Sequence, residues 1–350
     1  MAALSYHEQK DIENIKKLRE LIRDLPDFCR DFFRGIEPRT STRTRLAYAY
    51  DLRIFFDFLR HANSEAAKLG NAIPLSFLER LTVTDLEEYM EYLKCHPSAY
   101  EEDVTNTERG IMRKISSLRS FYNYFYRNER IEKNPAALVQ LPKLHEKEII
   151  RLEVDEVAKL LDLVEDGEKL TERQKKYHQL TKTRDLALLS LLLGTGIRVS
   201  ECVGLNLKDV DMENCGVRVY RKGGKEAVVY FSDEVRDILE SYLEERSRID
   251  ACAGHEDAFF LSLQKRRMAV RSVENLVKKY ATLAAPLKKI TPHKLRSTYG
   301  TSLYRETGDI YLVADVLGHS DVNTTKKHYA AQEDERRRRA RNMVRLREEK

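Results

Sequence analysis

The stretch from residue 291 to residue 329 decides the fold: it begins T-P-H-K-L-R-S-T-Y-G-T-S-L-Y and ends V-L-G-H-S-D-V-N-T-T-K-K-H-Y. Pro292 is typical of the first turn of a helix, because an N–H at that position has no helical partner to lose. His293 and Arg296 stand three residues apart, so the predicted helix presents both side chains on one face. The two side chains can therefore act on one target.

The second half of this stretch adds a histidine and a tyrosine. Gly318 is predicted to end a short apolar helix, and His319 follows it directly. Tyr329 stands ten residues after this histidine. Arginine grips phosphate oxygens in a fork, histidine moves protons and a tyrosine hydroxyl can attack phosphorus. The combination indicates an enzyme that handles a phosphate.

These motifs resemble the tyrosine recombinases, most closely the bacterial Xer-type enzymes and the integrases of phages and transposons. The resemblance rests on H-x-L-R at residues 293–296, L-G-H at residues 317–319 and a tyrosine near the chain end. It extends upstream to T-G-I-R-V-S-E at residues 195–201, and weakly over almost the whole chain. It implies a mainly helical protein with a small antiparallel sheet in the catalytic domain, and a two-domain DNA clamp.

The resemblance implies a role for each polar residue of the motifs. Arg198 and Arg296 would clamp the non-bridging oxygens of a phosphodiester. His319 would donate to one of these oxygens, and His293 would assist proton movement. Glu201 would orient Arg198 from three residues along the helix, although the same spacing also fits an ordinary ion pair.

The nucleophile and the general acid are implied in the same way. Tyr329 would attack and hold the DNA as a 3′-phosphotyrosine, and Lys222, in a predicted hairpin turn, would protonate the leaving 5′-oxygen. Lys225 in the same turn competes for this role. Most family members place the tyrosine nine residues after the second histidine, where this chain has His328. A histidine cannot form the stable phosphate ester that a tyrosine forms, so Tyr329 remains the predicted nucleophile.

Composition limits the class of protein. The chain has 350 residues, of which 34% are charged, and a mild net charge of +5 that permits nucleic-acid binding without arguing for it. Its five cysteines are scattered, so we expect a reducing cytoplasm and neither a disulfide framework nor a zinc site. No metal site or cofactor is expected, because the histidines show no i, i+4 pair. We also expect no signal segment and no membrane span.

The apolar pattern predicts several helices in the first part of the chain, and the whole chain divides into four predicted parts. Apolar residues at helical spacing predict a helix over 8–34, with a bend at Pro26, and a second helix over 39–60. An irregular connection is expected over 62–77, then a helix capped by Thr84 and another over 107–127. The predicted domains are a helical, SAM-like core-binding domain (1–140), a linker (141–150), the catalytic domain (151–331) and a basic C-terminal helix for subunit exchange (332–350).

In the second domain, T-R-D-L-A-L-L-S-L-L-L-G-T-G at residues 183–196 is apolar on most sides and predicts a buried helix. The segment 165–182 is charged and expected to be exposed. Alternating residues on both sides of K-G-G-K, at residues 222–225, predict a β-hairpin. Further helices are expected from Asp233 and from Ser272.

Basic residues of the first domain are predicted to contact DNA, since they lie off the apolar stripes of their helices. They are Arg39, Arg43, Arg45, Arg53, Arg113, Lys114 and Arg119. The arginines of segment 332–350 fit either a helix exchanged between subunits or a solvated helix face.

The sequence therefore predicts a site-specific recombinase that acts on a double-stranded recombination site as a tetramer. The expected partners include an accessory DNA-bending or cell-division protein, whose need the sequence leaves open. Two other functions compete: a type IB topoisomerase, which has similar catalytic residues, and a non-catalytic DNA-binding accessory protein. Resolution of chromosome dimers and integration of a mobile element fit the sequence equally.

Overall fold

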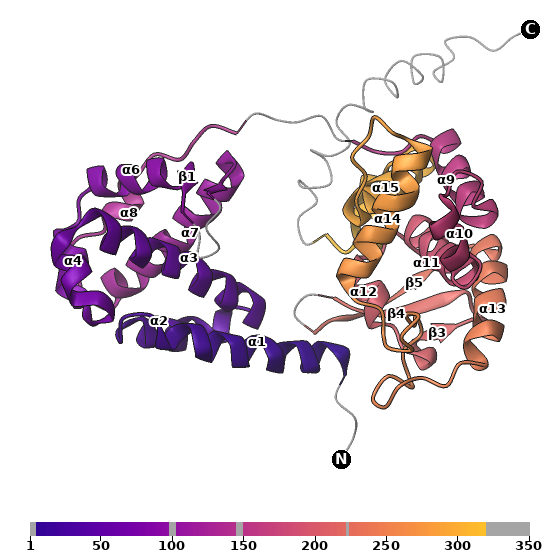
Figure 1. Cartoon of the computed structure of the whole chain (residues 1–350), viewed down its shortest axis with the longest axis horizontal. Coiled ribbons are helices and arrows are strands. Elements are labelled where there is room, and N and C mark those ends of the chain that lie inside the picture. The colour runs from indigo at the N-terminus through magenta and orange to yellow at the C-terminus, as the bar shows by residue number, and fades with distance from the viewer. Residues whose placement is uncertain (1–4, 98–102, 145–149, 222–223, 320–350) are drawn as a thin grey trace, which may run out of the picture. The chain divides into compact units, whose positions relative to one another are not determined.

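The computed structural model describes residues 5–97, 103–144, 150–221 and 224–319. The chain divides into two compact units, Met1–Lys147 and Glu148–Lys350 (Figure 1). Both units are mainly helical and each contains a small antiparallel sheet, which confirms the predicted fold class. Lys222, Tyr329 and the predicted helix over 332–350 lie outside the described residues.

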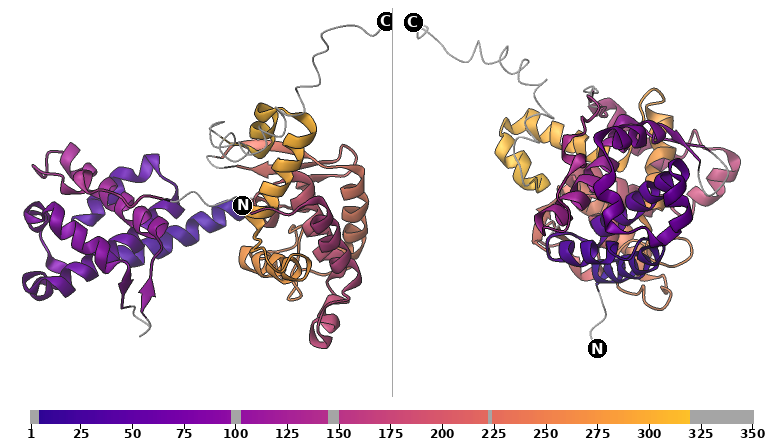
Figure 2. Two further views of the ribbon diagram at one scale, coloured as in Figure 1. Left: turned by 90° about the horizontal axis from the view of Figure 1, so that it is seen from above. Right: turned by 90° about the vertical axis from the view of Figure 1, so that its left-hand side faces the viewer.

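The first unit is a bundle of helices with one two-stranded sheet. The pair of strands projects from the helical body (Figure 2). The helices are α1 (Tyr6–Arg23), α2 (Cys29–Ile36), α3 (Thr42–Ala62), α4 (Ser64–Leu69), α5 (Leu75–Arg80), α6 (Val83–Tyr92), α7 (Glu108–Arg127) and α8 (Pro135–Leu138), with 3₁₀ turns η1 (Glu37–Arg39) and η2 (Gly70–Ala72) and strands β1 (Cys95–His96) and β2 (Val104–Thr105).

An aromatic cluster holds this unit together. Phe32 of α2 meets Phe121 of α7 edge-to-face at 5.0 Å between ring centroids, and Phe121 meets Phe125 in the same way at 5.1 Å. Phe28 packs on Phe125, and all four rings are buried. Such pairs add to the stabilisation that comes from removing the rings from water. The apolar stripe predicted for residues 107–127 is therefore confirmed as the core face of α7.

The predicted helix over 8–34 is two helices: the change of direction near Pro26 was predicted correctly, and the continuous helix was wrong. The break follows Arg23, because Pro26 has no N–H with which to continue the helical ladder. The carbonyl of Pro26 instead accepts a hydrogen bond from the N–H of Cys29 at 2.9 Å, where α2 begins. The segment 62–77, predicted to be irregular, contains α4 and the start of α5.

The sequence pattern predicts Thr84 as the cap of α6, and this prediction is wrong: the cap is Thr82. The Thr82 hydroxyl accepts from the N–H of Asp85 at 3.3 Å, and the Asp85 carboxylate accepts from the N–H of Thr82 at 2.6 Å. This reciprocal pair satisfies two donors at the helix start. Thr84 lies inside the first turn.

The second unit combines helices with a three-stranded antiparallel sheet of order β3-β4-β5. Its helices are α9 (Val154–Asp166), α10 (Glu172–His178), α11 (Lys182–Thr195), α12 (Val199–Gly204), α13 (Asp233–Ser247), α14 (Val270–Ala284), α15 (Pro292–Thr307) and α16 (Ile310–Leu317), with the 3₁₀ turn η3 (Leu207–Asp209) and strands β3 (Val210–Asp211), β4 (Gly216–Tyr220) and β5 (Glu226–Tyr230). The predicted hairpin is confirmed as β4–β5, whereas β3 was not predicted.

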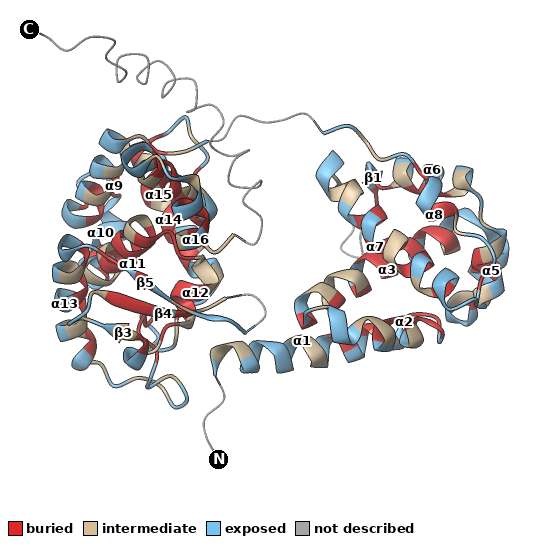
Figure 3. Cartoon of the chain, turned by 180° about the vertical axis from the view of Figure 1, so that it is seen from behind, coloured by how far each residue is buried: buried red, intermediate tan, exposed pale blue. Residues whose placement is uncertain are grey.

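Helix α11 is the centre of this unit, as its apolar sequence predicted. Leu188, Leu189 and Leu191 are fully buried, and the helix is largely red in Figure 3. It packs against α9, α13 and α15, so several other helices are positioned by it. The segment 165–182 was expected to be exposed; within it α10 forms, and His178 is buried with its Nε2 2.7 Å from the Val164 carbonyl.

We expect Phe121→Ala to lower the free energy of unfolding of the first unit by about 3–5 kcal/mol, because a fully buried ring is lost and a cavity remains. Tyr126→Ala on the same helix is the matched control, since Tyr126 is half exposed and should cost much less. Hydrogen exchange of α3 and α7 peptides at rising urea concentration measures both losses. Equal losses in the two variants would contradict the aromatic core.

Candidate active site

The amino end of α15 carries two of the predicted residues. Thr291 precedes the helix and Pro292 occupies its first turn, as the sequence predicted. His293 is exposed in that turn, whereas Arg296, one turn further on, is buried with 4% of its surface accessible. The helix thus presents a histidine at the surface and sends an arginine into the interior.

Arg296 joins the ends of two other helices. Its Nη1 donates to the Gly196 carbonyl at 2.7 Å, and its Nη2 donates to the Leu317 carbonyl. Gly196 ends α11 at φ 63° and Gly318 ends α16 at φ 61°, the left-handed conformation in which glycine commonly terminates helices. Terminal carbonyls lack helical partners, and a cation beside them is favoured by the helix dipole.

Arg198 reaches the same helix end from another direction. It stands directly before α12, with 38% of its side chain exposed. Its Nη1 donates to the Glu201 carboxylate at 2.7 Å, and its Nη2 donates to the Gly318 carbonyl at 3.3 Å. Glu201 is buried and also accepts from the backbone N–H of Arg198 at 2.7 Å. The glutamate therefore fixes both the backbone and the guanidinium of Arg198.

The structure brings Arg198, Arg296 and His319 to one place, the carboxyl end of α16. The two guanidiniums bind the consecutive carbonyls of Leu317 and Gly318, and His319 is the next residue. The backbone N–H of His319 donates to the Ala314 carbonyl at 2.9 Å, which closes the helix end. A partly exposed Arg198, a buried Arg296 and an imidazole beside one helix end can stabilise an anion and donate to it.

Other tyrosines of this region are placed for packing or for the surface. Tyr299 lies against Gly196, and burial raises the pKa of its hydroxyl above the usual value. Tyr304 is buried in a cluster with Val313 and Leu317. Tyr311 is 71% exposed on α16. The raised pKa of Tyr299 and the burial of Tyr304 oppose attack by these two hydroxyls, whereas neither reason applies to the exposed Tyr311.

One residue of this region was missed by the sequence reasoning. Arg221 follows β4 directly and donates from Nη1 to the Asp315 carbonyl at 3.1 Å and from Nη2 to the Val316 carbonyl at 2.6 Å. Its only signal in the sequence is an arginine next to the lysine of the hairpin turn. A contact between residues 94 apart in the chain is not visible in such a pattern.

Three of the predicted DNA-contacting residues bond to other groups of the first unit. Arg45 is buried and its Nη1 lies 2.5 Å from Glu37, and Lys114 is buried and donates to Asn106 at 2.6 Å. Arg119 donates to the backbone carbonyls of Ala136 and Val139. The expectation that Arg45 and Lys114 face outward was wrong, because their charges are satisfied within the protein.

The other four are placed nearer the surface. Arg39 and Arg43 are exposed around the start of α3. Arg53 lies over the ring of Tyr50, at 5.5 Å from its centroid. Arg113 is half exposed and is held at 2.5 Å by Asp51, a buried carboxylate whose pKa burial raises and Arg113 lowers. These four remain available to a phosphate, with Arg113 already oriented by Asp51.

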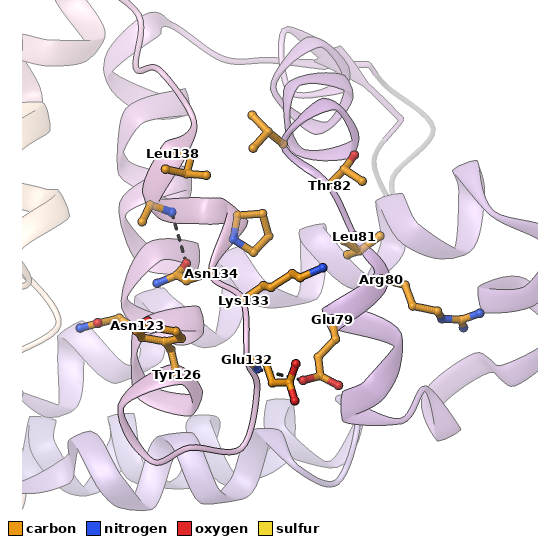
Figure 4. Close-up of a pocket in the computed structure, with 13 residues that line it drawn as sticks. Glu79, Arg80, Leu81, Thr82, Asn123, Tyr126, Glu132, Lys133, Asn134 and Leu138 are labelled. Carbon is orange, nitrogen blue, oxygen red and sulfur yellow. Dashed lines mark hydrogen bonds between the residues drawn. The ribbon is translucent and has the colours of Figure 1, made fainter.

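A cavity of about 920 Å³ lies in the first unit, and none of the predicted DNA-contacting residues lines it (Figure 4). Its polar groups bond to their own surroundings: Glu79 accepts from the N–H of Glu132 at 3.0 Å, and Asn134 accepts from the N–H of Ala137 at 3.2 Å. Glu79 and Asn134 are therefore engaged within the first unit.

Among the residues that the structure describes, no group of three histidine, cysteine, aspartate or glutamate residues is placed to hold a metal ion. Within the same residues, no helix has the length and apolarity that a membrane crossing requires.

Comparison with known proteins identifies relatives over most of the chain. Residues 151–336 match the phage integrase family. The tyrosine recombinase XerC of Caldanaerobacter subterraneus subsp. tengcongensis is 34% identical over 311 residues, covering 85% of this chain and 80% of that protein. The tyrosine recombinase XerS of Streptococcus pyogenes serotype M5 is 34% identical over 341 residues, covering 89% of this chain and 94% of that protein.

Solved structures show the same fold. The Tn1549 transposon integrase in complex with circular intermediate DNA has a TM-score of 0.61 at 20% identity, covering 87% of this chain and 95% of that one. XerH bound to its difH substrate has a TM-score of 0.59 at 19% identity, covering 82% and 76%. The matches favour neither a topoisomerase nor a non-catalytic accessory protein. The chain belongs to the phage integrase family and is a tyrosine recombinase, an enzyme of site-specific DNA recombination.

Proposed function

We propose that this chain cleaves and rejoins duplex DNA through a covalent 3′-phosphotyrosine on Tyr329. The observation that carries the proposal is the convergence of Arg198 and Arg296 on the last carbonyls of α16, directly before His319. A phosphodiester placed there meets two guanidiniums that match its non-bridging oxygens. His319 adds a donor for one of these oxygens.

The proposed step exchanges one phosphate ester for another. The hydroxyl oxygen of Tyr329 forms a bond to phosphorus while the bond from phosphorus to the 5′-oxygen breaks. The tyrosyl proton leaves toward His293 or solvent, and Lys222 gives a proton to the departing 5′-oxygen. Arg198 and Arg296 stabilise the charge that develops on the equatorial oxygens.

Rejoining is the reverse step. A 5′-hydroxyl attacks the phosphotyrosine, the bond to Tyr329 breaks, and the tyrosine recovers its proton. Because the ester to the enzyme conserves the bond energy of the phosphodiester, neither ATP nor a metal ion has to drive the reaction. Glu201 supports both directions by holding Arg198 through two hydrogen bonds.

The proposed substrate is a double-stranded recombination site. Two likenesses support this class of partner: the XerH structure contains its difH substrate and the Tn1549 integrase structure contains circular intermediate DNA. Exchange between two sites requires four active sites, so we propose a homotetramer in the cytoplasm, with segment 332–350 exchanged between subunits. An accessory DNA-bending or cell-division protein belongs to this proposal as a further partner.

The proposed division of labour follows the chain. In this proposal, residues 1–140 form the core-binding domain, 141–150 the linker and 151–331 the catalytic domain. The boundary between the two compact units falls between Lys147 and Glu148, within the proposed linker. Resolution of chromosome dimers and movement of a mobile element use the same chemistry. Footprinting the protein on its host chromosome distinguishes them by where it binds.

Tyr329→Phe should bind a recombination site with wild-type affinity and form no covalent adduct, because only the attacking oxygen is removed. The measurement is adduct formation on a nicked suicide substrate, quenched in sodium dodecyl sulfate, with peptide mapping of the wild-type adduct. Tyr311→Phe is the matched control and should react normally, since this tyrosine is exposed on α16. An adduct on another residue, or one that persists in Tyr329→Phe, would sink the proposal.

Lys222→Ala should fail to cleave ordinary DNA and yet cleave DNA with a bridging sulfur in place of the 5′-oxygen, because a thiolate leaves without an acid. Lys225→Ala should cleave both substrates. Single-turnover cleavage of the two DNAs by the two variants measures this. The reverse pattern would assign the acid to Lys225.

Arg43→Ala should reduce the salt slope of DNA binding by about one unit, because one phosphate contact is lost. Arg45→Gln is the matched control: its arginine is buried against Glu37, so the slope should stay at the wild-type value. Binding isotherms at several salt concentrations give both slopes. A wild-type slope in Arg43→Ala would move the DNA-binding face elsewhere.

A further inference from the structure

Arg221 links two elements that the proposed chemistry needs. It is the first residue beyond β4, and its guanidinium binds the Asp315 and Val316 carbonyls in the last turn of α16. The next two carbonyls of the same chain segment, Leu317 and Gly318, accept from Arg296 and Arg198. Four successive carbonyls therefore accept hydrogen bonds from three arginines. Of these arginines, Arg221 is the one that directly follows a strand of the sheet.

The fit around this contact is close. A Cβ atom at Gly318 would lie 2.3 Å from Nη1 of Arg221 and 2.5 Å from Cζ, so the guanidinium would have to shift to admit it. Gly318 also has φ 61°, which disfavours other residues. The glycine therefore ends α16 and leaves the space that the Arg221 guanidinium fills.

The two linked elements differ in what else holds them. Helix α16 is fixed by the buried side chains of Val313 and Leu317 and by the two other arginines. In the described part of the turn after β4, two backbone hydrogen bonds are present: the N–H of Arg221 donates to Lys225 at 2.8 Å, and the N–H of Gly224 donates to Arg221 at 3.2 Å. Loss of the Arg221 side chain should therefore loosen the turn and leave the helix in place.

We propose that Arg221 is a positioning residue that fastens the lysine-bearing turn between β4 and β5 to the carboxyl end of α16. In the proposed function the turn carries the general acid and the helix end carries the arginines and His319, so the link holds Arg221, the residue directly before Lys222, beside that helix end. Arg221 itself contacts neither the phosphate nor the leaving oxygen. The inference rests on the proposed function, because the effect is exerted on protonation of the 5′-oxygen.

Two other roles for Arg221 predict different behaviour. As a phosphate ligand it would contribute to the salt dependence of DNA binding. As a cap of α16 alone it would disturb Arg198, Arg296 and His319, and cleavage would be slowed whatever the leaving group. A role through the turn slows only the reaction that needs an acid.

The test compares Arg221→Ala with Arg218→Ala, which removes the same charge from an exposed position on β4. Single-turnover cleavage of saturating suicide substrate is measured with the normal 5′-oxygen and with a bridging 5′-sulfur. We expect Arg221→Ala to cleave the oxygen substrate about 10- to 100-fold more slowly, the scale of a misplaced catalytic group. It should cleave the sulfur substrate at the wild-type rate and keep the wild-type salt slope. Arg218→Ala should match wild type on both DNAs.

Several results would overturn the inference. They are a wild-type rate of Arg221→Ala on the oxygen substrate, an equal slowing on both substrates, or a salt slope reduced by about one unit. Arg221→Lys decides the matter should the alanine variant fail to fold: one ammonium reaches fewer carbonyls, so its oxygen cleavage should be intermediate and its sulfur cleavage normal. A wild-type protein that forms no adduct in this assay would instead overturn the proposed function.

Discussion

The carbonyl oxygens at the carboxyl end of α16 are the constraint around which the catalytic unit is arranged. A helix leaves its last carbonyls without helical partners, and here arginines from three separate segments supply them. Arg198 comes from the start of α12, Arg221 from the end of β4 and Arg296 from α15. One short helix end therefore fixes the relative positions of three elements, and the residue that follows it is His319.

That helix end depends in turn on the packing of α11. Arg296 bridges the carbonyls of Gly196 and Leu317, so the position of its guanidinium is set by the ends of two helices. Gly196 admits the Tyr299 ring and the Leu317 side chain so closely that a Cβ would lie 2.5 Å and 2.9 Å from them. The packing of α11 against α9, α13 and α15 fixes the Gly196 carbonyl. Through that carbonyl it also fixes the position of the Arg296 guanidinium.

Local patterns were sufficient for much of the fold. The helix over 107–127, the buried helix before Gly196 and the hairpin were predictable, because periodicity and turn glycines act within a few residues. The pattern failed where partners are distant: Arg45 and Lys114 were expected at the surface, and Glu37 and Asn106 satisfy their charges inside. At the site, the clustering of Arg198 with Arg296 was suggested by family motifs, whereas the contact of Arg221 with α16 depends on tertiary structure. The roles of Lys222 and Tyr329 rest on resemblance.

The arginine contacts to α16 also bear on the thermodynamics of DNA recognition. A free arginine side chain carries about 2 kcal/mol of rotamer entropy, which an ion pair with a phosphate must ordinarily overcome. Arg296 is already held by two carbonyls, and Arg198 by Glu201 and Gly318, before any nucleic acid arrives. Their conformational freedom is lost during folding and not during association. In the proposed reaction, the entropic cost of ordering these two side chains therefore does not oppose their attraction to a phosphate.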